Sequence, residues 1–309
     1  MTNLKKLGLT ALAGSLVATT GYAGELSIAG TAKASYTGGD TQNVTGNPYS
    51  MSTAITFSGS GELDNGMNIA LTMVTDNGSS TFSSSSLVLD MGDAGSLALL
   101  NGMNGGYGAG SVKDKMPTAG EEVYDDMAGD ETGIVAMTSS NTLAYGNTIS
   151  GVKFSVDFNA DNGNDGSSKS GAVEYSPVDG LNLFVGRADI TAATNETDKH
   201  TTYGATYTTM GATVGLQMTS IADATANSDI DRTHLAASFA VNENLSVSYG
   251  MSTVEFESAS LTDQEDSGFG ASYTMGSMSF GASMLKSDNV AGASGTDDTH
   301  KELSVAFAF

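Results

Sequence analysis

The chain has 309 residues, of which 15% are charged and 39% are hydrophobic, and 39 residues are glycine. Both fractions are below those of an average soluble domain, so a large apolar core is not expected. Low charge and only three prolines are atypical of a disordered chain, and the lack of cysteine excludes a disulfide framework.

The first 23 residues are predicted to be a secretory signal peptide. Lys5 and Lys6 precede an apolar run from Leu7 to Ala18, and the sequence GYA that ends at residue 23 fits a small-x-small cleavage site. The alternative is an N-terminal membrane anchor, but that would need roughly 20 apolar residues. Residues 24–309 are therefore predicted to form one exported domain.

The predicted exported domain is strongly acidic. After residue 23 there are 35 acidic and 10 basic residues, which give a net charge of −25. DNA, RNA and anionic lipid are unfavourable partners for such a chain as a whole, because they carry the same sign of charge.

From residue 25 onwards, apolar and polar side chains alternate. In ELSIAGTAKASY (25–36), Leu26 and Ile28 share one face, whereas Ser27, Lys33 and Ser35 share the other. Successive Cβ atoms of a strand point to opposite sides, so this pattern predicts a strand with one apolar and one polar face. The alternation recurs in MSTAITFSG, MNIALTM, GVKFSVDF, HLAASFAV, LSVSYGM, FGASYTM, MSFGASM and LSVAFAF.

About sixteen strands of roughly 10 residues are predicted, beginning near residues 25, 50, 67, 83, 96, 140, 151, 169, 181, 200, 212, 231, 245, 266, 278 and 300. Short connections such as LDNG and MG are rich in residues that tolerate the positive φ of tight hairpins. Longer, polar connections lie between them. This rhythm predicts an antiparallel up-and-down meander.

The two faces distinguish a β-sandwich from a membrane barrel. The polar face is mainly Ser, Thr, Ala and Gly, which suits the wall of a water-filled channel, and the strands are longer than the usual five or six residues. Open sheets cannot cross lipid, because unpaired backbone groups cost several kcal/mol each. We therefore predict an all-β fold, a transmembrane antiparallel barrel in which the first strand pairs with the last.

Four segments, in this order, carry a resemblance to a known family: GELSIAGTAKASY, ELDNGMNIALTM, NTLAYG after a long third outer loop, and LSVAFAF. The chain resembles the Gram-negative general porins, and most of all their alphaproteobacterial (Rhodobacter-type) branch. The resemblance implies a sixteen-stranded outer-membrane barrel, usually a homotrimer, whose third loop folds into the lumen while small hydrophilic solutes diffuse through. It also implies that an aromatic such as Phe309 is the signal read by the outer-membrane assembly machinery.

The long connection from Gly102 to about Gly133 matches that constriction loop in position. A connection of this length usually has a function, and its acidic residues are Asp114, Glu121, Glu122, Asp125, Asp126, Asp130 and Glu131. By strand parity, few basic side chains face them from the wall: Lys33, Lys153 and Arg232. Since carboxylate rings attract cations, we expect a mild cation preference. The alternative is a solvated outer loop.

Other chemistry is weakly indicated. The segment DNGNDG (161–166) resembles the start of a calcium loop, but Gly163 and Ala172 stand where ligands are needed. Weakly bound calcium on clustered carboxylates is the only cofactor expectation. No enzyme is expected, because serine is so common that a Ser next to a His is uninformative. Two rivals to a channel are a non-channel surface barrel, either an adhesin or a structural protein, and a soluble exported β-solenoid or sandwich that binds calcium or glycans.

Overall fold

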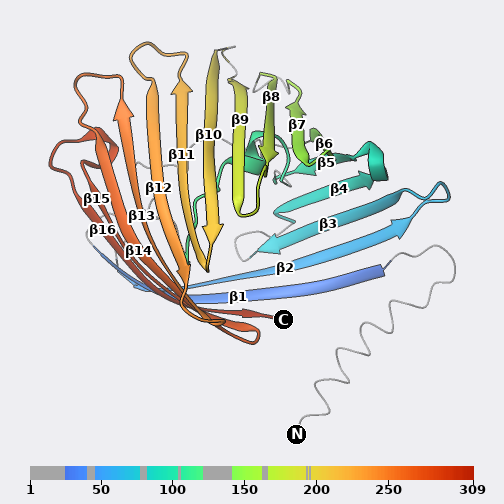
Figure 1. Ribbon diagram of the computed structural model, residues 1–309, viewed down its shortest axis with the longest axis horizontal. Coiled ribbons are helices and arrows are strands. Elements are labelled where there is room, and N and C mark those ends of the chain that lie inside the picture. Colours follow the sequence, from blue (N-terminus) through green and yellow to red (C-terminus); the bar gives the residue numbers. More distant parts are fainter. Residues whose placement is uncertain are drawn as a thin grey trace, which may run out of the picture.

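The computed structural model describes residues 25–39, 46–76, 82–103, 106–120, 141–161, 166–192, 194 and 196–309. The predicted signal peptide lies outside these residues. Within them, the strands form one closed antiparallel barrel, in which consecutive strands pair and the first strand pairs with the last (Figure 1). The predicted barrel is confirmed.

The described residues contain sixteen strands: β1 (Glu25–Gly39), β2 (Tyr49–Glu62), β3 (Asn68–Asp76), β4 (Ser84–Asp90), β5 (Ser96–Asn101), β6 (Thr142–Ile149), β7 (Val152–Asn159), β8 (Ser168–Tyr175), β9 (Leu181–Thr191), β10 (Thr197–Thr209), β11 (Ala212–Ala222), β12 (Ile230–Ala240), β13 (Leu245–Phe256), β14 (Gln264–Met275), β15 (Met278–Asp288) and β16 (Asp298–Ala308). Each begins within three residues of its predicted start. The connection from β5 to β6, residues 102–141, is longer than the predicted range.

Short and long connections alternate along the chain. The β10–β11 hairpin turns on Met210 and Gly211, which both have positive φ (49° and 81°). That geometry is the two-residue type I′ turn, whose twist matches that of the flanking strands. In the described parts of the connections there are three short 3-10 helices, η1 (Gly92–Ala94), η2 (Gly108–Val112) and η3 (Val290–Gly292). No helix among the described residues is long and apolar enough to cross a membrane.

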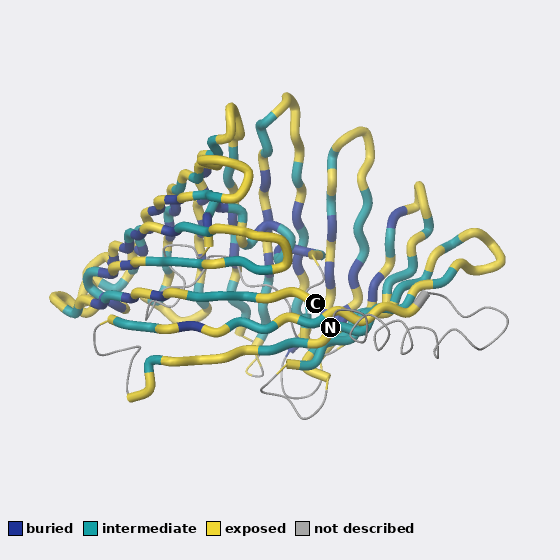
Figure 2. Tube along the Cα trace, turned by 90° about the horizontal axis from the view of Figure 1, so that it is seen from below, coloured by how far each residue is buried: buried dark blue, intermediate teal, exposed yellow. Residues whose placement is uncertain are grey.

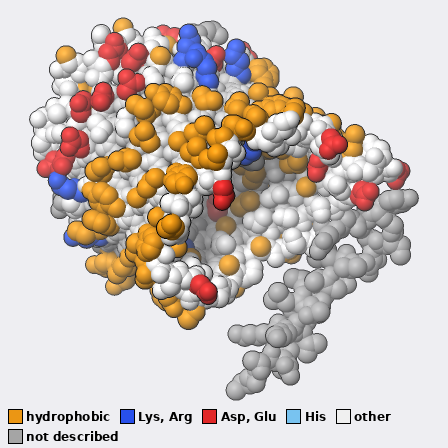
Figure 3. Space-filling model, viewed as in Figure 1, with side chains coloured by type: hydrophobic (Ala, Val, Ile, Leu, Met, Phe, Trp, Pro, Cys, Tyr) orange, Lys and Arg blue, Asp and Glu red, His pale blue; other side chains and the backbone are white. Residues whose placement is uncertain are grey.

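The wall has two chemically different faces. On β7, the apolar Val156 and Phe158 are about half exposed, whereas Ser155 and Asp157, which alternate with them, are buried. The same alternation of buried and exposed residues follows many strands in Figure 2. Hydrophobic side chains form bands over the outside of the barrel in Figure 3. The apolar face is therefore the outer one, and the polar face is turned inward.

Buried hydrophobic residues gather where the β5–β6 connection meets the polar face. Val112 and Met116 of the connection pack with Ala172 on β8 and Phe184 on β9. Tyr107 packs beside a second small cluster formed by Ala98, Leu100 and Ala144. The described part of the connection thus takes part in the buried hydrophobic clusters of the barrel. Its contact with the polar face of the wall defines the candidate site.

Candidate functional site

Residues 106–120 of the β5–β6 connection, here called the docked segment, contact the polar face of the wall. At its start, the hydroxyl groups of Tyr107 and Ser96 on β5 are 2.9 Å apart. The backbone N–H of Ala109 donates to Ser170 Oγ on β8 at 2.7 Å, and Ser170 Oγ donates in turn to the Asp157 carboxylate on β7. Buried backbone groups need such partners, so these contacts fix the entry of the segment.

The middle and the end of the docked segment are bonded to more distant strands. Gln217 on β11 donates through Nε2 to the carbonyl oxygens of Val112 (3.3 Å) and Lys113 (3.1 Å). The backbone N–H of Ala119 donates to Ser248 Oγ on β13 at 2.9 Å. Gln217 is 1% exposed. Side chains of the wall therefore satisfy the backbone of a segment that has no strand partner of its own.

Three glycines of the wall leave room for this contact. A Cβ on Gly186 would lie 2.6 Å from Val112 Cγ2, one on Gly215 would lie 2.6 Å from Pro117 Cδ, and one on Gly270 would lie 2.8 Å from the Ala119 oxygen. Real Cβ atoms do not approach other atoms so closely. Glycine inside a strand often marks a close approach of another backbone, and here that backbone is the docked segment.

Ion pairs connect the docked segment to the wall and pair two of the three predicted wall cations, Lys33 and Lys153, with carboxylates. Glu174 on β8 lies 2.9 Å from Lys115 Nζ of the segment and 3.0 Å from Lys153 Nζ on β7. Lys33 on β1 lies 2.6 Å from Glu302 on β16. The Glu174 side chain is 12% exposed, so this carboxylate is held between two cations in a mostly buried place.

The structure places the predicted site residues unevenly. Lys33, Lys153 and Arg232 all lie on the polar face, and Arg232 on β12 is buried. Asp114 lies on the docked segment and is exposed. The remaining predicted acidic residues lie outside the described residues: Glu121, Glu122, Asp125, Asp126, Asp130 and Glu131. The acidic cluster therefore stays a prediction.

Glu174 and Glu302 were not among the residues expected from the sequence. Each follows the period-two parity of its strand, so the same signal that selected Lys33 and Lys153 could have found them. Ser170, Gln217 and Ser248 carried no comparable signal, because the polar face is full of such residues.

Two polar cavities flank the docked segment. One, of about 610 Å³, is lined by Tyr107, Asp90, Asp93, Asn147 and Lys153, among others. The other, of about 270 Å³, is lined by residues that include Gly120, Lys33, Glu302, Ser279 and Ser283. The first cavity meets the beginning of the segment and the second meets its end, so polar space borders the segment on the inward-turned face of the wall.

The remaining residues of interest are the three histidines, the calcium-like segment and Phe309. His200, His234 and His300 are buried on the polar face, and the described residues contain no group of three or more His, Cys, Asp or Glu arranged to hold a metal ion. Residues 162–165 of the calcium-like segment lie outside the described residues. Phe309 donates its N–H to the Gly30 oxygen at 2.8 Å and is 78% exposed.

Solved structures of bacterial porins resemble this barrel over almost their whole length. The anion-selective porin from Comamonas acidovorans is 14% identical, with a TM-score of 0.70 over 92% of this chain and 99% of that one. A porin refined at 1.8 Å is 15% identical, with a TM-score of 0.71 over 92% and 100% of the two chains. The chain has the fold of the bacterial porins.

A triple mutant of the Rhodopseudomonas blastica porin is also similar, at 16% identity and a TM-score of 0.64 over 92% and 100% of the two chains. No family model and no curated protein matches the sequence. At these identities the likeness establishes the porin fold. The Rhodobacter-type branch stays a prediction.

Proposed function

We propose that this protein is an outer-membrane porin of the Rhodobacter-type branch, a water-filled channel for the passive diffusion of small hydrophilic solutes and ions. The observation that carries the proposal is a closed sixteen-stranded barrel with an apolar outer face and a polar inner face. A barrel of about eight strands would be filled by its own side chains, whereas sixteen strands leave a channel. Strand number therefore favours a channel over the rival non-channel surface barrel. Because the sheet is one closed barrel, it is neither the solenoid nor the sandwich of the rival soluble protein.

The docked segment is proposed to narrow the channel. Its contacts with β8, β11 and β13 support this role, since they hold one stretch of chain along the polar face of widely separated strands. The hydrogen bonds and ion pairs to the wall favour a fixed constriction over the alternative of a solvated outer loop. Diffusion through a fixed constriction needs no catalytic group, so we do not propose an enzymatic role.

A mild cation preference is proposed for the same constriction. Two of the wall cations, Lys33 and Lys153, lie against carboxylates, and the chain after residue 23 has a net charge of −25. The carboxylates of Asp114, Glu121, Glu122, Asp125, Asp126, Asp130 and Glu131 would add negative potential, which attracts cations. The Comamonas porin has the same fold and is anion-selective, so selectivity must come from particular side chains and not from the shared fold.

The proposed setting follows from the same reading. We propose that the signal peptide directs export and that the assembly machinery recognises Phe309. The assembled protein would be a homotrimer in contact with outer-membrane lipid. No resident cofactor is proposed, and weak calcium binding would be confined to surface carboxylates. Nucleic acid is not proposed as a partner, because the chain is acidic.

The test is electrical. The protein is reconstituted into a planar bilayer, and the reversal potential is measured across a potassium chloride gradient. Neutralising Glu121, Glu122, Asp125 and Asp126 together should shift the potential towards lower cation permeability. The matched control neutralises four acidic residues of the β11–β12 and β13–β14 connections, Asp223, Asp229, Glu257 and Asp263. Equal shifts in both variants would contradict a constriction formed by the long connection. Absence of conductance in the unaltered protein would refute the channel itself.

A further inference from the structure

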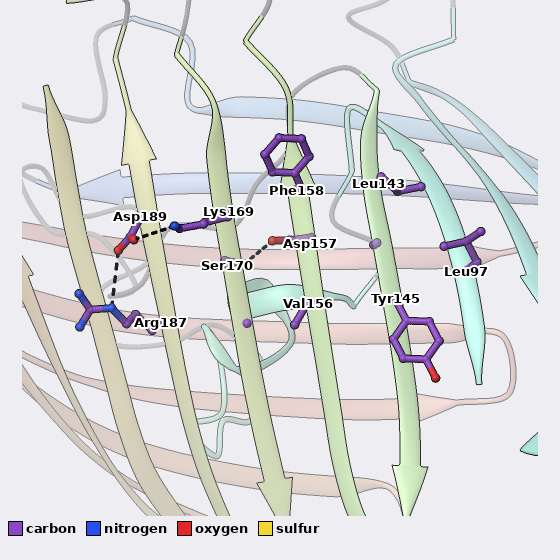
Figure 4. Close-up of a pocket in the computed structure, with 12 residues that line it drawn as sticks. Leu97, Leu143, Tyr145, Val156, Asp157, Phe158, Lys169, Ser170, Arg187 and Asp189 are labelled. Atoms are coloured by element: carbon purple, nitrogen blue, oxygen red, sulfur yellow. Dashed lines mark hydrogen bonds and ion pairs between the residues drawn. The ribbon is translucent and has the colours of Figure 1, made fainter. Parts of the chain in front are cut away.

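The outer face of the barrel carries an apolar groove between β5 and β9, with a volume of about 540 Å³ (Figure 4). Leu97, Leu143, Val156 and Phe158 line it, and all four are large exposed hydrophobic residues. Gly171 on β8 also lines the groove and pairs with Arg187 on β9. Because glycine has no side chain, the groove stays open beside Arg187. The volume lies within the range of about 300–1,000 Å³ that is typical of small-molecule sites.

Three basic side chains gather near one end of this groove. Lys169 is the second residue of β8, Arg187 lies on β9 and Lys199 lies near the start of β10, all with the parity of the outer face. The strand register puts Asp189 directly opposite both Lys169 and Lys199. Figure 3 shows Lys and Arg side chains at the corresponding upper edge, above the hydrophobic bands. One carboxylate among three cations leaves a local charge of about +2 on a strongly acidic chain.

Neither Lys169 nor Arg187 is hydrogen-bonded to Asp189. Lys169 Nζ lies 3.8 Å and Arg187 Nε lies 3.6 Å from the Asp189 carboxylate, which is longer than a hydrogen bond. The side chains of Lys169 and Arg187 are 71% and 58% exposed. In Figure 4 the contact with Asp189 runs from Nε of Arg187, and the two terminal nitrogens take no part in it. Those nitrogens are the ones that form bidentate contacts with phosphate.

We propose that this groove binds one anionic lipid, with an acyl chain over Leu143, Val156 and Phe158 and with the headgroup phosphate held by Lys169, Arg187 and Lys199. Lys169 and Lys199 lie within two residues of the starts of β8 and β10, and Arg187 lies four residues before the end of β9. This is near the end of the apolar band, which is the depth of lipid headgroups. The overall charge of the chain disfavours anionic lipid. However, salt screens the repulsion from carboxylates that lie more than about 8 Å away. The local cluster of basic residues therefore determines the interaction with the headgroup.

The inference rests on the proposed membrane location, and its test counts lipids. The detergent-solubilised protein is titrated with phosphatidylglycerol or with phosphatidylcholine of the same acyl chains, and bound lipid is counted by native mass spectrometry. The protein should retain phosphatidylglycerol in preference to phosphatidylcholine. The variant K169Q/R187Q should lower its retention by about thirtyfold, and G171L, which fills the groove without changing charge, should also lower it.

The matched control is K286Q/K301Q, which removes two cations from the outer face of β15 and β16 and should leave retention unchanged. Retention of phosphatidylglycerol by K169Q/R187Q at the unaltered level, or an equal loss in the control, would overturn the inference. A smaller oligomer in K169Q/R187Q would assign the groove to a second copy of the chain and would overturn it too. Conductance is recorded in parallel, so a conducting protein that shows no lipid preference refutes this inference and leaves the proposed function standing.

Discussion

The double variant Q217L/S248A should release the middle and the end of the docked segment from the wall. It removes the hydrogen bonds from Gln217 Nε2 to the carbonyl oxygens of Val112 and Lys113, and the bond from the Ala119 N–H to Ser248 Oγ. A hydrogen bond contributes about 1 kcal/mol net, so the three together stabilise the docked position by about 3 kcal/mol. Since 1.4 kcal/mol is a factor of ten, the population of released segment should rise by roughly a hundredfold.

The assay is single-channel recording in a planar bilayer. The variant should show an added conductance level or larger open-channel noise, because the middle and the end of the segment then exchange between bound and released positions. The control S35A/S50A removes a 2.6 Å hydroxyl contact between β1 and β2 on the same polar face, away from the segment. Heat-modifiable migration on a detergent gel checks that each variant forms the barrel. Conductance and noise equal to those of the unaltered protein would refute the view that these bonds hold the segment.

Three further outcomes are expected. The substitution Gly215→Leu should push the docked segment off the wall at a cost of about 1–3 kcal/mol, because a Cβ there would already lie 2.6 Å from Pro117; a changed single-channel conductance measures this, and an unchanged one counts against close contact. Glu174→Gln should shift the reversal potential towards anions, since Lys115 and Lys153 would lose their shared carboxylate; a shift of the opposite sign would contradict the assignment. Deletion of Phe309 should reduce the yield of heat-modifiable barrel more than it changes the conductance of the molecules that do assemble, and a normal yield would argue against the assembly role.

The strands were predictable because a wall with two unlike faces imposes period two on every strand. A shift of one residue would move each apolar side chain to the polar face. That constraint is local, so Phe158 and Ser155 could be assigned to opposite faces from the sequence alone. Polar residues that continue the alternation hide the boundary between a strand and its connection. β10 begins at Thr197, three residues before the expected start.

The docking of the β5–β6 connection could not be predicted in the same way. Gln217 is 105 residues from Val112, and Ser248 is 129 residues from Ala119, and no periodicity connects positions so far apart. In the sequence, Gly186 and Gly215 look like weak points in their strands. Their meaning depends on a segment that approaches from another part of the chain. Long-range contacts of this kind are visible only once the barrel is closed.

The pairing of β1 with β16 has a consequence for the timing of folding. Thr31 pairs with Ala308 and Gly39 with His300, so the seam joins strands that are more than 250 residues apart in the chain. Until β16 has been synthesised, both edges of the sheet carry unpaired backbone groups that could pair with other chains. Contacts of such high sequence separation form slowly. The barrel must therefore close after translation of β16, and the growing chain has to be kept from aggregating until then.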